Sequence, residues 1–73
     1  MTIHLNGDPF ELPGPLTVSA LLANLNIDSR RVAVELNLAV LKRTTFDATV
    51  IQAGDTMEIV NFVGGGAPRG GGA

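Results

Sequence analysis

The stretch TMEIVNFVGGG, from Thr56 to Gly66, decides how the rest of the sequence is interpreted. Up to Val63 its residues alternate between two sets, with the period of two that is typical of a β-strand. One set is Met57, Ile59, Asn61 and Val63, and the other is Glu58, Val60 and Phe62. Because burying a carboxylate without a partner is costly, we expect the second set on a sheet face that no helix covers.

Val60 and Phe62 are then apolar side chains that face solvent, with Ala33 expected beside them. Exposed apolar patches often mark interaction sites, although two exposed apolar residues are also ordinary on a protein surface. The strand leads directly into the glycine run, which favours a role in binding. We therefore predict these partner-binding residues on and just after the strand: Val60, Phe62, Glu58 and Gly64.

Glycine is distributed unevenly along the chain, since six of its nine glycines lie between Gly64 and Ala73. This change in composition marks the end of the packed region at about Val63, because the residues beyond it have little to bury. The sequence therefore predicts one domain over residues 1–63 and a flexible glycine-rich tail over residues 64–73.

The N-terminal part of the chain predicts a hairpin followed by a helix. Residues 2–5 and 9–12 alternate as two strands around Asn6-Gly7, which is a strong signal for a type I′ turn. Thr17 is a suitable N-cap, because its hydroxyl can accept a free backbone N–H of the first helical turn. The helix it begins has an apolar stripe formed by Val18, Leu21, Leu22 and Leu25.

Further strands follow this helix. Asn26 suits the left-handed position after the last helical turn, onto which Ile27 is expected to fold back. Residues 31–36 and 39–42 are predicted as two strands, the second at a sheet edge. With the strand over residues 56–63 the order is β-β-α-β-β-β, which predicts a two-layer α+β domain.

The connection at Asn37-Leu38 conflicts with a tight turn. A positive φ at leucine costs about 1 kcal/mol or more, so we expect either another turn type or a longer loop there. Gly54-Asp55 indicates a turn directly before the last strand.

Composition excludes several classes of function. The chain has 73 residues, a net charge of −2, no cysteine and one histidine, His4, which cannot form a metal site alone. The charge argues against nucleic acid as a partner. The sequence shows no signal peptide and no membrane-spanning run, so we expect a cytoplasmic protein that binds no membrane. A domain this small leaves little room for a complete active site. We also expect a monomer that is not an enzyme and holds no cofactor.

The glycine run is the main candidate for chemistry. Glycine has no Cβ, so a Gly-Gly end can thread a narrow channel and present an unhindered carboxylate. A carboxylate of this kind enters acyl chemistry by attacking ATP to give an acyl-adenylate, which a sulfur or nitrogen nucleophile then opens. No G-x-x-x-x-G-K-[ST] motif occurs, so a separate protein would have to activate it. The alternative is that residues 64–73 are only a flexible linker.

Several segments together resemble the ThiS sulfur carrier proteins of thiamine biosynthesis. They are Asn6-Gly7, Glu11-Leu12-Pro13, residues 17–22, residues 31–37, Gly54-Asp55 and residues 58–66, in register over residues 2–66. The Gly-Asp turn, the strand and the Val-Gly-Gly-Gly ending are the most specific part. The resemblance implies an α+β, ubiquitin-like β-grasp fold, with a mixed sheet of four to five strands and one main helix on one face.

The resemblance also implies that the chain is a protein cosubstrate. A ThiF-type adenylyltransferase uses ATP to adenylate the terminal carboxylate, and a sulfur donor replaces AMP to leave a thiocarboxylate. A ThiG-type thiazole synthase then uses that sulfur. Carried over by position, Gly66 holds the reacting carbonyl and Gly65 is the neighbour that fits the channel. Val60 and Phe62 match positions that contact the activating enzyme.

Two positions depart from the family pattern. Leu38 replaces the usual glycine in a distal turn, and residues 67–73 follow the glycines at which the family normally ends. While Gly66 is joined to Ala67 it has no carboxylate to adenylate. Trimming by a protease, an extension added in cloning, or chemistry moved to Gly72 would each account for these residues. Reach disfavours the last, since Gly72 lies up to about 30 Å beyond the strand and Gly66 about 10 Å.

Two other functions stay open from the sequence. One is a ubiquitin-like module that binds proteins and uses its tail as a linker. The other is a sulfur carrier for a different pathway, such as that of molybdopterin, although such carriers tend to be longer.

Overall fold

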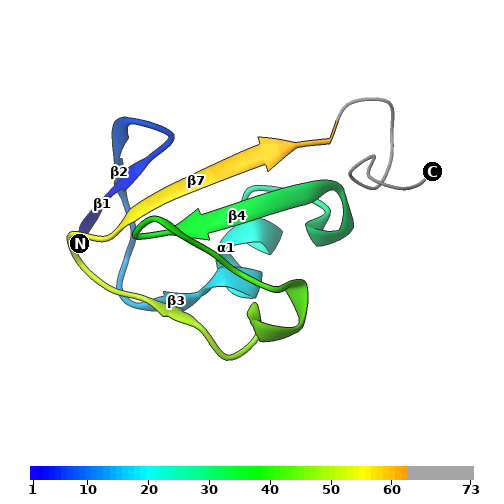
Figure 1. The fold of residues 1–73 in the computed structure, drawn as a ribbon. Helices are drawn as coiled ribbons and strands as arrows, with labels where there is room; N and C mark the ends of the chain where they lie inside the picture. Colours follow the sequence, from blue (N-terminus) through cyan, green and yellow to red (C-terminus); the bar gives the residue numbers. More distant parts are fainter. Residues whose placement is uncertain (63–73) are drawn as a thin grey trace.

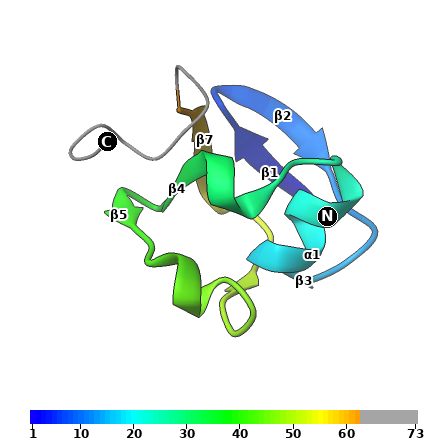
Figure 2. The same ribbon diagram turned by 90° about the vertical axis from the view of Figure 1, so that its right-hand side faces the viewer.

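The fold is built on a mixed five-stranded sheet, which the computed structural model describes within residues 1–62 (Figure 1). In chain order its strands are β1 (Thr2–Leu5), β2 (Asp8–Glu11), β4 (Val32–Leu36), β5 (Ala39–Val40) and β7 (Thr56–Asn61). Across the sheet the order is β2-β1-β7-β4-β5, which Figure 2 shows from right to left. The central strand β7 is parallel to β1 and antiparallel to β4.

The other elements lie beside this sheet. They are the helix α1 (Val18–Asn24), the two-stranded sheet of β3 (Leu16–Thr17) and β6 (Val50–Ile51), and the 3-10 turns η1 (Ser29–Arg31) and η2 (Arg43–Thr45). The arrangement is that of a ubiquitin-like β-grasp domain of the α+β class, which confirms the predicted fold class. None of the helices found within residues 1–62 has the length and apolar character to cross a membrane.

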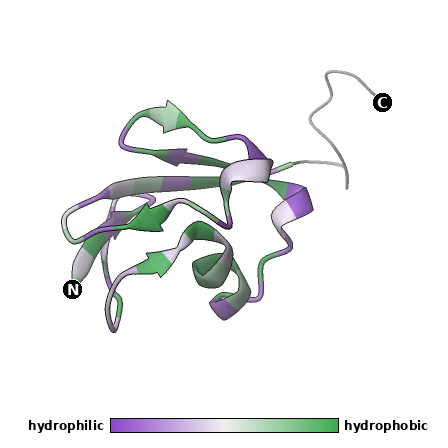
Figure 3. Cartoon of the chain, turned by 90° about the horizontal axis from the view of Figure 1, so that it is seen from below, coloured by the Kyte–Doolittle hydropathy of each residue, from purple (hydrophilic) through white to green (hydrophobic). Residues whose placement is uncertain are grey.

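One apolar core joins α1 to the large sheet. Hydrophobic and hydrophilic residues alternate along the strands in Figure 3, as a sheet with one covered face requires. The buried residues are Ile3, Leu12, Val18, Leu21, Leu22, Val32, Val34, Phe46, Ile51 and Met57. Among residues 1–62 no polar or charged side chain is buried, so packing of apolar surface is the main stabilising term.

The first hairpin confirms the predicted turn. Asn6 and Gly7 have φ values of 50° and 88°, the left-handed backbone that a type I′ turn needs. Leu5 pairs with Asp8 directly across this turn. The second strand therefore covers Asp8–Glu11, one residue earlier at each end than the predicted range of 9–12.

The helix begins and ends where the sequence predicts. The Thr17 hydroxyl accepts a hydrogen bond of 3.0 Å from the backbone N–H of Ala20. Asn26 has a φ of 58°, and the backbone N–H of Ile27 donates to the carbonyl of Leu22 at 2.9 Å. The predicted stripe faces the core, with Leu25 half-buried at its end and its other members buried.

The sequence pattern did not predict the elements between β5 and β7. The predicted strand over residues 39–42 ends at Val40, and η2 and β6 follow it. Two-residue strands are too short to show a period, so β3 and β6 gave no signal. The segment also caps α1, because the carbonyls of Thr49 and Phe46 accept from the N–H groups of Val18 and Ser19.

The turn between β4 and β5 corrects an expectation. Asn37 and Leu38 have φ values of 51° and 71°, so the connection is a tight two-residue turn despite the leucine. Asn37 anchors it to the start of β7, because its side-chain oxygen accepts from the N–H of Thr56 at 2.9 Å and its amide nitrogen donates to Asp55 at 3.0 Å. Leu38 itself is 88% exposed and therefore gains little from packing.

Replacing Leu38 by glycine should stabilise the domain. The left-handed backbone of leucine costs the folded state about 1–2 kcal/mol, and glycine removes this cost. Against this gain, glycine loses about 0.5–1 kcal/mol more conformational entropy on folding. We expect Leu38→Gly to raise the free energy of unfolding by up to about 1 kcal/mol, measured by urea denaturation. A less stable variant would show that the leucine side chain makes stabilising contacts that outweigh the backbone strain.

Candidate functional site

The candidate site lies on the second half of β7, which leads to the glycine run. β4 pairs with β7 from Leu36 opposite Met57 to Val32 opposite Asn61. The backbone N–H of Phe62 then donates to the carbonyl of Arg31 at 2.9 Å. The antiparallel partner thus holds the chain up to the last residue that the structure describes.

The other edge of β7 is held by β1 at its start and by a side chain farther along. β1 pairs with β7 only at His4 opposite Thr56 and Leu5 opposite Met57. Beyond this point the Asn6 amide takes over, with its oxygen accepting from the N–H of Ile59 at 2.7 Å and its nitrogen donating to the Ile59 carbonyl at 3.2 Å. The amide supplies both hydrogen bonds that a neighbouring strand would make.

The predicted faces are confirmed within β7, which ends at Asn61, two residues before the predicted end of the strand at Val63. Glu58 and Val60 are exposed on the face away from α1, and Ala33 of β4 lies opposite Val60 as expected. Met57 on the other face is fully buried. Phe62 is half-buried and so less exposed than expected. The role of Glu58, Val60 and Phe62 in binding a partner stays a prediction.

A shallow hollow of about 70 Å³ lies on the open face, meaning the face of the large sheet away from α1. Its lining residues are Ala33, Val34, Glu35, Val40, Glu58 and Val60. Glu35 and Val40 were not predicted as parts of this site. The shared face of Ala33 and Glu35 was visible in the strand pattern, but the pairing of Glu35 with Val40 depends on where the tight turn falls.

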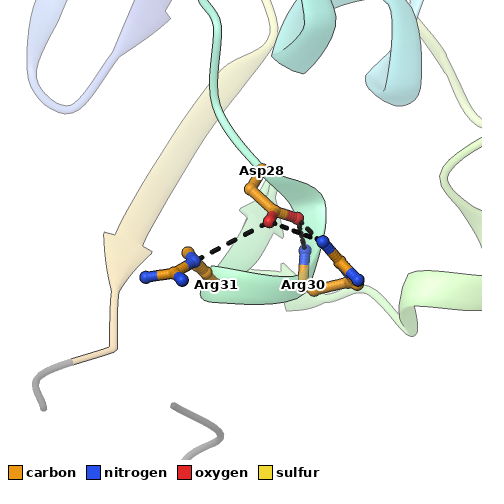
Figure 4. Close-up of polar contacts among 3 residues, drawn as sticks. All are labelled: Asp28, Arg30 and Arg31. Carbon is orange, nitrogen blue, oxygen red and sulfur yellow. Dashed lines mark hydrogen bonds and ion pairs between the residues drawn. The ribbon is translucent and has the colours of Figure 1, made fainter. Parts of the chain in front are cut away.

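A charged cluster lies beside the end of β7 (Figure 4). The Arg30 guanidinium donates to both carboxylate oxygens of Asp28 at 3.1 Å, and the Arg30 backbone N–H donates to the same carboxylate at 2.9 Å. Arg31 approaches from the side of β7, with its Nε 3.7 Å from Asp28 Oδ2. The side-chain hydrogen bonds from Arg30, with its backbone bond next, lower the pKa of Asp28 from its ordinary value of 3.8 to about 2. The same hydrogen bonds raise the pKa of Arg30.

The three predicted glycines of the site, Gly64, Gly65 and Gly66, lie outside the described residues. The domain boundary at residue 63 falls there too, so both stay predictions. Within the described part of the chain, no three His, Asp or Glu side chains gather closely enough to hold a metal ion.

Asn6→Gly should weaken the hold on β7 while keeping the backbone of the turn. Loss of two exposed hydrogen bonds should lower the free energy of unfolding by about 1–2 kcal/mol and speed amide exchange at Ile59. Asn26→Gly is the matched control, because Asn26 also has a positive φ. Equal losses in the two variants, with unchanged exchange at Ile59, would assign the effect to glycine entropy alone.

The Asp28 carboxylate should contribute to stability in a defined pH range. Its pKa is lower in the folded chain, so its contribution is complete above pH 3.8 and is lost as the pH falls through about 2. Asp28→Asn should lose stability above this range and show a shallower fall in stability between about pH 4 and pH 2. NMR titration of the Asp28 carboxyl checks the pKa directly. A midpoint near 3.8 would show that the hydrogen bonds from Arg30 do not lower it.

Comparisons with known proteins agree on one family. The ThiS family model matches residues 3–66. A crystal structure of thiamine biosynthesis protein ThiS from Geobacter metallireducens superposes with a TM-score of 0.79 at 42% identity, covering 90% of this chain and 100% of that one.

Two further relatives differ in length. A thiazole synthase of Magnetococcus marinus is 46% identical over 66 residues, which make up 90% of this chain and 20% of that protein. The chain thus spans about one fifth of the length of this curated relative. The uncharacterized protein ycf40 of Pyropia yezoensis is 41% identical over 66 residues, covering 90% of this chain and 93% of that protein. The chain belongs to the ThiS family.

Proposed function

We propose that the protein is a sulfur carrier for the thiazole part of thiamine, with the carboxylate of Gly66 as the group that carries sulfur. The observation that carries this proposal is the extent of the family match, which ends at Gly66, the third residue of the glycine run. The likeness to a ThiS structure over 90% of the chain supports the same function.

The proposed chemistry begins at a free Gly66 carboxylate. One of its oxygens attacks the α-phosphorus of ATP in a ThiF-type adenylyltransferase, which forms the acyl-adenylate and releases pyrophosphate. The terminal sulfur of a donor persulfide adds to the acyl carbon and AMP leaves, which gives an acyl disulfide. A thiolate of the donor system then attacks the donor-side sulfur, which breaks the S–S bond, releases the thiocarboxylate and leaves the donor as a disulfide. A ThiG-type thiazole synthase then takes the sulfur. The chain is a cosubstrate in this scheme, and its partners supply the catalysis.

The chain itself supplies a rigid base for this group. Two strands and the Asn6 amide hold β7, so the path toward Gly66 starts from a fixed point. Gly65 would pass a narrow channel because it has no side chain. Val60, Phe62, Glu58 and Gly64 are proposed to contact the adenylyltransferase, as the exposed positions of Glu58 and Val60 allow.

Residues 67–73 must leave before the chemistry can occur at Gly66, because a peptide bond to Ala67 occupies its carbonyl. We propose removal by a protease when these residues are native, and an extension added in cloning is the alternative origin. Chemistry at Gly72 is disfavoured by reach, since it lies up to roughly 20 Å farther along an extended chain than Gly66.

The thiazole synthase is proposed as the acceptor of the sulfur. Two proteins named thiazole synthase, from Magnetococcus marinus and Paramagnetospirillum magneticum, contain a stretch similar to this chain as about one fifth of their length. Holding two modules in one chain raises their effective concentration, which suits successive steps of one reaction.

Mass spectrometry tests the proposal. A form ending at Gly66 is incubated with ATP, the adenylyltransferase of the same organism and a sulfur donor. We expect its mass to rise by the difference between one sulfur and one oxygen atom. The matched control is the full chain ending at Ala73, which should not change.

Other outcomes separate the alternatives. An unchanged mass of the Gly66 form beside an active enzyme contradicts the proposal. If removal of residues 64–73 leaves the biological activity intact, the domain is a ubiquitin-like binding module. Rescue of a molybdopterin defect but not a thiamine defect would assign the carrier to the other pathway.

A further inference from the structure

We propose that the hollow on the open face receives an apolar side chain of the thiazole synthase, while Glu35 and Glu58 bind a lysine or arginine of the same synthase segment. The inference rests on the proposed function and adds the chemistry by which the synthase recognises this chain. The synthase would use Glu58 and Val60 after the adenylyltransferase, which is proposed to contact the same two residues at an earlier step, has left. It brings in Glu35 and Val40, which the glycine run and the β7 pattern did not assign.

The hollow exists because of a small side chain and a short strand. Ala33 lies opposite Val60, and its short side chain leaves space above β4. β5 ends at Val40, so it does not extend alongside Ala33. The resulting volume of about 70 Å³ is enough for a branched aliphatic side chain, since roughly 10–15 Å³ already admits a water molecule.

The walls of the hollow are apolar and largely uncovered. Val40 is 74% exposed and Val60 is 58% exposed, on the two strands that flank β4. A partner that covers apolar surface of this kind gains binding free energy, because the surface is removed from water. The two valines therefore favour an apolar occupant.

The rim of the hollow is negatively charged. Glu35 and Glu58 lie directly opposite each other in the β4–β7 ladder and both line the hollow. Like charges in this position repel, and neither carboxylate takes part in an ion pair with any other residue of the described range 1–62. A single cation placed between them would interact favourably with both, which selects a lysine or arginine beside the apolar side chain.

The same charges argue against a second copy of this chain as the occupant. Face-to-face pairing of two copies would bring four carboxylates together, two from each copy. Each copy already has a net charge of −2. The thiazole synthase is the better-supported partner, because two relatives of that name contain a stretch similar to this chain. Charge complementarity then requires a basic patch on the synthase.

Calorimetric titration of the full chain with the thiazole synthase of the same organism tests the inference. We expect Val40→Ser to raise Kd about tenfold, because it removes an apolar wall of the hollow. We expect Glu35→Gln together with Glu58→Gln to raise Kd about tenfold at low salt and to reduce the dependence of Kd on salt. The double variant should unfold at the same or a higher temperature, since the repulsion is gone.

Two variants serve as matched controls. Val50→Ser removes another exposed valine, 44% exposed on β6 and away from the hollow, and should leave Kd unchanged. Leu38→Gly changes stability without touching the lining of the hollow and should also leave Kd unchanged.

The outcomes distinguish failure of this inference from failure of the proposed function on which it rests. No binding by the wild-type chain overturns the proposed acceptor and this inference together. Equal Kd values for wild type, Val40→Ser and the double glutamine variant overturn this inference alone. A concentration-dependent dimer that Val40→Ser abolishes, seen by sedimentation, also overturns it, because a second copy would then occupy the hollow.

Discussion

The hydrogen-bonded pairing of β7 between β1 and β4 is the constraint on which the rest of the structure depends. It joins the N-terminal hairpin to the β4–β5 hairpin, and it places the fully buried Met57 at the centre of the core. The same strand carries Glu58 and Val60 on the open face. Core packing and the composition of the open face are therefore set by one register, and a shift by one residue would exchange the two faces.

Local signals made much of this fold predictable. Asn6-Gly7 marked a turn that needs two left-handed residues, and Thr17 with its apolar stripe marked α1. The cost of burying Glu58 was enough to choose between the two faces of β7. Each of these inferences depends on chemistry contained within a few neighbouring residues.

Features formed by distant residues could not be predicted in this way. The Asn6 amide binds Ile59 across 53 positions of sequence, and no local pattern indicates that contact. Phe46 and Ile51 enter the core from a segment whose strand is too short to show a period. Leu38 adopts a backbone that leucine disfavours, because Asn37 fixes the turn through bonds to Asp55 and Thr56. The role proposed for Gly66 rests on the family resemblance, because the chemistry that the resemblance implies would be carried out by partner enzymes.

Among residues 1–62 the strand that comes last in sequence is also the middle strand of the sheet, which has a consequence for folding during synthesis. A nascent chain that has not yet released Asn61 from the ribosome can form the first hairpin and α1, but its two halves have no common strand to join them. Folding must then wait for contacts between the ends of the domain, which are slow to form because they are far apart in sequence. A chain made only as far as Gly54 consequently lacks the strand that carries Glu58 and Val60 on the open face.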